Sequence, residues 1–134
     1  MDTGRQNTKS KDSTESAESY TMRQATKILN VNAQRLRRYC RKGLVSGVRQ
    51  PRLGQEYVFT VTQMDALRRA HFMTLAGFTV KDIRKYNRLA HDDSAHSVQE
   101  RRSLLGTHKR QVWQQLEDLQ QTIDFLERLD DELR

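Results

Sequence analysis

The chain has 134 residues, of which 35% are hydrophobic and 31% are charged, and its mean hydropathy is −0.90. This length and composition fit one small domain with or without an appendage, and they leave too little apolar material for the deep pocket of a sizeable enzyme. No stretch reaches the roughly 18 consecutive apolar residues of a membrane span, and residues 1–19 lack the apolar segment of a secretory signal. We therefore expect a cytoplasmic protein without a membrane partner.

The formal net charge is +7, and it is distributed unevenly. Residues 20–89 carry 15 Lys and Arg against 3 Asp and Glu, whereas the segments before and after this block are net acidic. So basic a block is typical of a protein that binds a polyanion; a solvated basic face without a partner is the alternative. The single cysteine, Cys40, can neither form a disulfide within the chain nor build a structural zinc site, so no metal or cofactor is expected.

Two short helices are predicted at the start of the basic block. Thr21 is a typical N-cap for a helix that ends near Leu29, with apolar residues at spacings of three and four. Asn32 has the right side chain to cap a second helix over 33–42, and Gly43 follows where a helix end favours a left-handed residue. Two such helices joined by about three residues form a helix-turn-helix.

The next segment is predicted to be a small β-hairpin, or wing. Two short extended stretches, 44–46 and 56–59, flank a part of the chain that contains the proline and two of the glycines. Thr60 and the glutamine three residues later then form a capping box that starts a helix running to Gly77. A further short helix follows Thr79, and we expect its apolar side chains to point inward; they are Val80, Ile83 and Tyr86.

The longest regular pattern lies at the end of the chain. Its apolar positions recur at spacings of three, four and seven; they are Leu105, Val112, Leu116, Leu119, Ile123, Leu126 and Leu133. Lys109 and Asp130 fill the two gaps in this heptad seam. So narrow a stripe does not fold alone, and no other predicted helix is of similar length, so we expect the seam to meet the same helix of a second chain. Folding back as an ordinary surface helix is the alternative.

The predicted fold class is all-α with a small β wing: a winged helix-turn-helix domain followed by a long dimerisation helix. The domain covers 19–90, a polar connector covers 91–97, and the helix covers 98–134. The residues before them, 1–18, are polar without apolar periodicity, which predicts a disordered tail.

Several short segments are individually weak signals but specific in their order and spacing. They are Tyr20–Met22, Lys27–Asn32, Leu36–Tyr39, Gly43–Val45, Tyr57–Thr60 with Met64, Ala76–Thr79 and Asp82–Ile83. Together with the terminal helix they resemble the MerR (mercury-resistance regulator) family of bacterial transcription factors. The resemblance implies a winged helix-turn-helix that dimerises through an antiparallel coiled coil. It also implies that the dimer binds and distorts a palindromic promoter operator, where RNA polymerase is a further partner.

The chain departs from the family pattern at three points. The family's Arg-Tyr-Tyr-Glu stands here as Arg37-Arg38-Tyr39-Cys40, and the usual wing arginine is missing from Glu56-Tyr57-Val58-Phe59. Arg49 and Arg52 are candidates for its phosphate contact. The family's metal-sensing cysteines and drug-binding domain are absent, so the sequence names no small-molecule effector.

The second helix carries most of the predicted DNA contacts. A helix in the major groove presents its N-terminal side chains to base edges, so Gln34 and Arg35 are assigned to base reading. Arg37 and Tyr39 match family positions that hold phosphates. The remaining members of the predicted DNA surface are phosphate candidates or complete its edges; they are Thr21, Arg23, Asn32, Arg38, Lys42, Arg49, Arg52 and Tyr57.

Two further features have competing interpretations. The basic neighbours of Cys40 favour a thiolate and hence a redox switch, but we expect the other interpretation, a small buried residue at the end of a helix. Three aromatic residues, Tyr86, Trp113 and Phe125, either line a small-molecule pocket or pack in the core, and we expect packing.

An antiparallel pairing of two terminal helices, centred between Leu119 and Gln120, brings Lys109 of one chain within reach of Asp130 of the other. Such a pair favours one register more than it adds stability.

The sequence thus predicts a homodimeric, sequence-specific regulator that binds double-stranded promoter DNA and is associated with the nucleoid. The alternative is an architectural, excisionase-like DNA-binding accessory protein, although such proteins commonly lack so long a dimer helix. No paired carboxylates, activated nucleophile or phosphate-binding glycine loop is visible, which argues against an enzyme.

Overall fold

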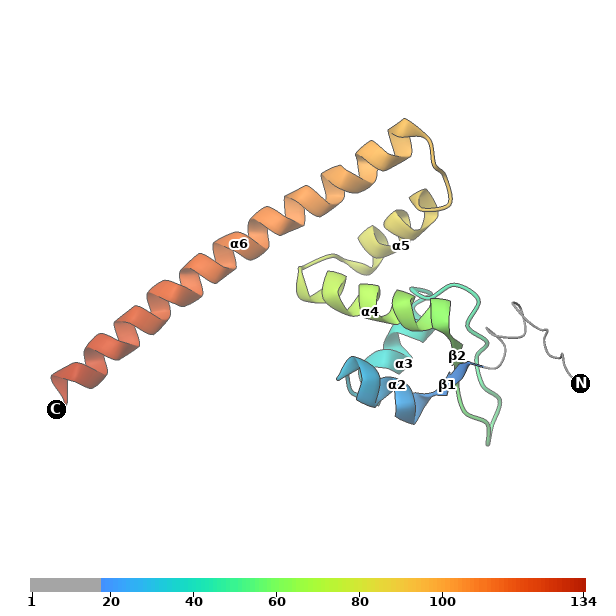
Figure 1. Cartoon of the computed structure of the whole chain (residues 1–134), viewed down its shortest axis with the longest axis horizontal. Helices are drawn as coiled ribbons and strands as arrows, with labels where there is room; N and C mark the ends of the chain where they lie inside the picture. Colours follow the sequence, from blue (N-terminus) through green and yellow to red (C-terminus); the bar gives the residue numbers. More distant parts are fainter. Residues whose placement is uncertain (1–17) are drawn as a thin grey trace, which may run out of the picture. The chain divides into compact units, whose positions relative to one another are not determined.

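The computed structural model describes residues 18–134, so the predicted tail lies outside the described residues except for its last position. The chain forms two compact units that divide between Thr74 and Leu75. Among the described residues, no helix has both the length and the apolarity needed to cross a membrane. In chain order (Figure 1) the elements are β1 Ser19–Thr21, α2 Met22–Leu29, α3 Ala33–Arg41, β2 Val58–Thr60, α4 Val61–Leu75, α5 Val80–Leu89 and α6 Ala95–Glu132.

Helices α2 and α3 form the predicted helix-turn-helix. The Thr21 hydroxyl accepts a hydrogen bond from the Gln24 amide at 3.1 Å, and the Gln24 side chain accepts one from the Thr21 amide at 2.9 Å. The Asn32 side chain accepts a hydrogen bond from the Arg35 amide at 2.8 Å. Both predicted N-caps are therefore confirmed. Helix α3 ends at Arg41, one residue earlier than predicted.

The predicted pairing of the wing strands is wrong. Strand β2 pairs antiparallel with β1, with Ser19 opposite Thr60 and Thr21 opposite Val58. Residues 44–46 form no strand, because the consecutive side chains of Leu44 and Val45 are both buried in the core. A half-exposed strand would bury only alternate side chains.

The first unit has a core to which each of its helices contributes. Ala25 of α2, Leu36 of α3 and Leu67 of α4 are fully buried. Phe59 of β2 is also fully buried. The predicted capping box at the start of α4 is confirmed by hydrogen bonds of 3.1 and 2.9 Å between Thr60 and Gln63. This unit presents α3 on a fixed core.

In the second unit, α5 packs along the first part of α6. Thr79 caps α5 in a capping box with Asp82, and the inward Ile83 is 1% exposed. Val80 and Tyr86, also predicted inward, are half-buried. At the other end of α5, the Ser97 hydroxyl donates a hydrogen bond to the Leu89 carbonyl at 2.5 Å.

Helix α6 begins earlier than predicted, because Ser94 caps it and residues from Ala95 onward are helical. The predicted polar connector over 91–97 therefore shrinks to 91–94. The Ser94 amide and hydroxyl donate to the Asp92 carboxylate at 2.9 and 3.1 Å, and these hydrogen bonds hold the pKa of Asp92 below its ordinary value.

Candidate nucleic-acid interface

Helix α3 has one buried face and one cationic face. Leu36, Tyr39 and Cys40 point into the core at spacings of three and four. The exposed residues between and around them are mostly cationic; they are Gln34, Arg35, Arg37, Arg38, Arg41 and Lys42. Within residues 18–134, no carboxylate lies within ion-pair distance of any α3 arginine. Unneutralised guanidinium groups on an exposed helix suit an anionic partner.

The first turn of α3 presents the two residues assigned to base reading. Gln34 and Arg35 are both exposed, and they follow directly on the Asn32 cap. Because the Asn32 side chain holds the Arg35 amide, the cap fixes where the helix begins. Ten of the twelve residues predicted to contact DNA are exposed, and the two exceptions are tyrosines.

Tyr39 is 4% exposed and lies in the core of the first unit. Its hydroxyl forms a hydrogen bond of 3.2 Å with Nδ1 of His71, which joins α3 to α4. The structure thus gives Tyr39 a packing role, and a direct phosphate contact stays a prediction.

Tyr57 is 7% exposed, and its ring stacks on Phe59 with centroids 5.8 Å apart. Its hydroxyl donates a hydrogen bond to Oε1 of Gln50 at 2.7 Å, while Nε2 of Gln50 donates to the Cys40 carbonyl at 3.4 Å. Burial raises the pKa of Tyr57. Gln50 therefore links the wing loop to the end of α3. Sequence reasoning missed Gln50, because a lone glutamine in a polar loop carries no spacing signal.

The tip of the wing is a tight turn. The Gln55 amide donates to the Arg52 carbonyl at 2.9 Å, and Gly54 has a φ of +83°, which few other residues adopt without strain. Arg49 and Arg52 are exposed on either side of Pro51. Both arginines are thus available to a ligand that reaches the wing.

The buried position of Cys40 shifts the pKa of its thiol in the direction opposite to the one expected from its basic neighbours. The side chain is 4% exposed, and burial raises the pKa of the thiol from 9.0 to about 11, with the attraction of Arg41 as the smaller effect. A thiolate is therefore not favoured, and the structure supports the expected small buried residue.

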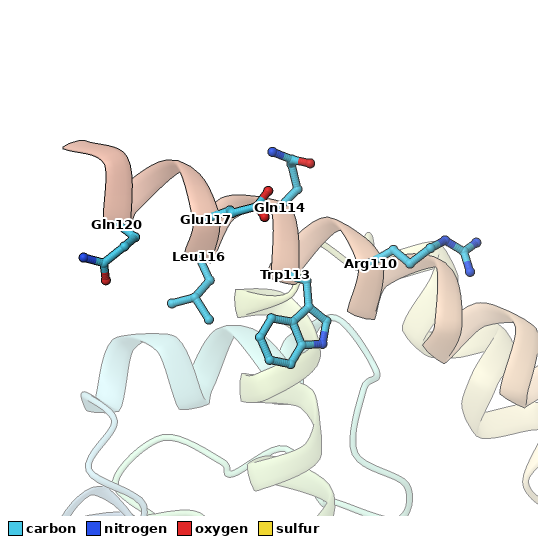
Figure 2. A pocket seen from close by; sticks show the side chains of 6 residues that line it. All are labelled: Arg110, Trp113, Gln114, Leu116, Glu117 and Gln120. Atoms are coloured by element: carbon cyan, nitrogen blue, oxygen red, sulfur yellow. The ribbon is translucent and has the colours of Figure 1, made fainter. Parts of the chain in front are cut away.

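The seam of α6 is exposed along its length in the single chain. Its exposed fractions range from 39% for Val112 to 86% for Leu133, and Trp113 beside it is 63% exposed. Figure 2 shows Trp113 and Leu116 projecting from the same side of α6, where they help to line a hollow. The other residues that line this hollow are polar or charged; they are Arg110, Gln114, Glu117 and Gln120.

The three aromatic residues that were expected to pack together, Tyr86, Trp113 and Phe125, do not form a core. Phe125 is 52% exposed and Trp113 more so, while Tyr86 is half-buried. The prediction that Trp113 and Phe125 pack in a core is therefore wrong for the described residues of one chain. Neither Phe125 nor Tyr86 lines the hollow beside Trp113.

Comparisons with known proteins agree with this arrangement. Residues 20–89 match the profile of the MerR HTH family regulatory proteins, and residues 64–129 match the profile described as MerR, DNA binding. No curated protein sequence gives a significant match.

Three solved structures share the fold. HiNmlR, described as a MerR family regulator lacking the sensor domain and bound to promoter DNA, is 24% identical, with 80% of each chain covered and a TM-score of 0.68. A putative MerR family regulator from Listeria monocytogenes is 21% identical over 85% of this chain and 83% of that one, with a TM-score of 0.61.

A MerR family regulator from Bacillus thuringiensis is 16% identical, with 83% of this chain and 96% of that chain covered and a TM-score of 0.67. The profile match at residues 20–89 spans the helix-turn-helix, the wing, α4 and α5, and thus more than half of the sequence. The chain belongs to the MerR family of helix-turn-helix transcriptional regulators.

Proposed function

We propose that the protein is a homodimeric regulator that binds a palindromic operator in promoter DNA and distorts it. The observation that carries this proposal is the row of exposed arginines on α3, none of which has a carboxylate of residues 18–134 within ion-pair distance. Its partners are double-stranded DNA, a second copy of the chain and RNA polymerase at the same promoter, in the bacterial cytoplasm. The promoter DNA bound to HiNmlR, which has the same fold, supports this choice of ligand.

The proposed DNA contacts divide by chemistry. Gln34 and Arg35 read base edges, because a glutamine amide pairs with adenine and a guanidinium with guanine. The exposed cations around them hold phosphates; they are Arg23, Arg37, Arg38, Lys42, Arg49 and Arg52. Thr21 and Asn32 act at the helix N-termini that they cap, and Tyr39 and Tyr57 act as positioning residues through His71 and Gln50.

The charge pattern of α6 supports an antiparallel dimer. Residues 95–113 carry four Lys and Arg against one acidic residue, whereas residues 114–132 carry seven Asp and Glu against one Arg. Two such helices attract each other when they run in opposite directions and repel each other when they run parallel. The exposed seam supplies the apolar surface that this pairing buries.

The experiment that tests the proposal is recovery of bound fragments from sheared DNA of the source genome, followed by sequencing. We expect one inverted repeat within promoters, and binding to it that weakens steeply as salt rises, because phosphate contacts release counterions. Broad recovery without an inverted repeat would contradict the proposal and favour the architectural alternative.

Two variants separate base reading from phosphate binding. Arg35→Ala should change the preferred sequence, whereas Arg37→Ala should weaken binding to all sequences and reduce the salt dependence. Arg128→Ala, which removes an exposed arginine far along α6, is the matched control. An unchanged sequence preference in Arg35→Ala would show that the base-reading assignment is wrong.

A further inference from the structure

Leu53, at the tip of the wing, is a fully exposed aliphatic side chain. The other large apolar residues exposed in the described part of the first unit are 52–61% exposed; they are Ile28, Val58 and Phe72. Leu53 therefore adds nothing to the packing of its own unit. A partner that reaches the wing gains the free energy of covering this side chain.

The turn that carries Leu53 has a defined shape. The Arg52 carbonyl accepts a hydrogen bond from the Gln55 amide at 2.9 Å, and the Arg52 amide donates to Oε1 of Gln55 at 3.4 Å. Gly54 follows Leu53 with a φ of +83°, as the glycine of a type II β-turn does. Because the turn is held by its own hydrogen bonds, little conformational entropy is lost when Leu53 meets a partner.

The side chains beside Leu53 suit a phosphate backbone. Arg49 and Arg52 are exposed, and no carboxylate of residues 18–134 lies within ion-pair distance of either. Residues 49–56 contain one acidic side chain, Glu56. An apolar tip beside two unneutralised guanidinium groups fits the minor groove of DNA, which has phosphates along its borders and admits apolar wedges between its bases.

The wing tip is also within reach of a minor groove when α3 lies in a major groove. Nε2 of Gln50 donates to the Cys40 carbonyl at 3.4 Å, so the wing is joined to the last turn of α3. Leu53 is three residues beyond Gln50, a span of at most about 10 Å. Figure 1 shows the loop between α3 and β2 projecting from the helices of the first unit to a narrow tip. Adjacent grooves are separated by one sugar–phosphate strand, and the minor groove, about 6 Å wide, is too narrow for a helix but admits a side chain from a turn.

We propose that Leu53 of each protomer enters the minor groove beside the half-site that α3 reads and acts there as an apolar wedge, with Arg49 and Arg52 on the bordering phosphates. The inference rests on the proposed function and adds a minor-groove contact to it. This contact disfavours guanine at the wedge, because the guanine amino group projects from the floor of the groove where the leucine packs. The wedge also opens the groove, so it is one physical source of the proposed distortion.

Binding of the full chain to its recovered operator, measured by fluorescence anisotropy, tests the wedge. Leu53→Ala should raise the dissociation constant about fivefold or more, because the dimer loses apolar contacts at two wings. Leu53→Met keeps the apolar bulk and should bind within about twofold of the wild type. Ile28→Ala, which removes exposed apolar surface from α2, is the matched control and should bind as the wild type does. Leu53 is fully exposed, so its substitution leaves the fold intact.

Base analogues test which groove the wing enters. Diaminopurine in place of adenine beside each half-site adds an amino group to the minor groove and leaves the major-groove edge unchanged, whereas inosine in place of guanine removes such a group. The wild type should bind the diaminopurine operator about fivefold more weakly than the unmodified operator, and the inosine operator more tightly. The response of Leu53→Ala to either analogue should be less than about twofold.

Three results would overturn the wedge while operator binding stands. The first is equal affinity of the Leu53→Ala and Ile28→Ala proteins, and the second is a Leu53→Met protein as weak as Leu53→Ala. The third is an equal response of the wild-type and Leu53→Ala proteins to the base analogues. A wild type that selects no inverted repeat would instead overturn the proposed function on which the wedge rests.

Discussion

The ring of Phe78 stacks on the imidazole of His108 with centroids 4.0 Å apart and 28° between their planes. The edge of the imidazole is also engaged, since Nε2 lies 3.6 Å from the Asp82 carboxylate. His108 therefore binds the residue before the cap of α5 and a residue of its first turn at once. This pair of contacts fixes the start of α5 on α6.

Phe78→Ala should destabilise the protein by about 3–5 kcal/mol, because Phe78 is 7% exposed and its loss leaves a cavity beside His108. Urea unfolding at one fixed protein concentration measures the effect, since a dimer's stability depends on concentration. Thr107→Ala, an exposed neighbour of His108, is the control. Equal effects of the two substitutions would contradict the role of the stacked pair.

Tyr39→Phe should cost about 1 kcal/mol of unfolding free energy, because it removes the 3.2 Å hydrogen bond to His71 and leaves a part-buried ring nitrogen unpaired. If Tyr39 acts only by positioning α3, the salt dependence of operator binding stays at the wild-type value. A salt dependence lowered by one phosphate contact would instead restore the direct contact that the family resemblance implies.

Cys40 should react slowly with iodoacetamide in the folded protein. Its pKa of about 11 leaves little thiolate at pH 8, and its side chain is 4% exposed. The rate should rise by at least about tenfold in urea, where the thiol regains its ordinary pKa. A fast reaction without urea would revive the redox-switch interpretation.

The same thiol predicts a loss of stability in alkali. Between pH 9.0 and about 11 the folded chain keeps the Cys40 proton that the unfolded chain releases. The free energy of unfolding should therefore be unaffected by Cys40 below this window, and it should fall as pH rises through the window. Cys40→Ala should show a smaller fall over the same window, which separates the thiol from other groups that titrate there.

Lys109 and Asp130 should act as a pair across the dimer. Lys109→Asp places like charges opposite each other in the seam and should weaken the dimer, and adding Asp130→Lys should recover most of the loss. Sedimentation equilibrium measures both. Additive losses in the double variant would rule out the pairing centred between Leu119 and Gln120.

Local signals predicted the helices well, because each depends on residues only a few positions apart. The caps at Thr21, Asn32 and Thr60 are hydrogen bonds between neighbours, so the sequence alone identifies them. The pairing of β1 with β2 joins residues about forty positions apart, for which Tyr20 and Phe59 carry no local signal. For this reason the strand partner predicted for 56–59 from the sequence is wrong.

The sequence predicted which residue types lie at the candidate site, but it did not predict how deeply each side chain is buried. Charge and spacing identified the exposed side chains of α3 correctly as exposed. Burial depends on the whole unit, so the sequence did not indicate that Tyr57 would be bound by Gln50, and its basic residues around Cys40 pointed away from the burial that raises the pKa of that thiol. In both cases desolvation outweighs the neighbouring charges that a sequence displays.

The amide of Gln50 anchors the wing below its tip, through Tyr57 on one side and the Cys40 carbonyl on the other. The turn from Arg52 to Gln55 lies outside that anchor and closes on itself. Apart from Gly54, whose positive φ favours glycine, its residues can thus change in size and charge while α3 keeps its place. With the proposed assignment of Arg49 and Arg52 to phosphates and of Gln34 and Arg35 to bases, substitutions at the wing tip would adjust the strength of binding without changing the sequence that α3 reads.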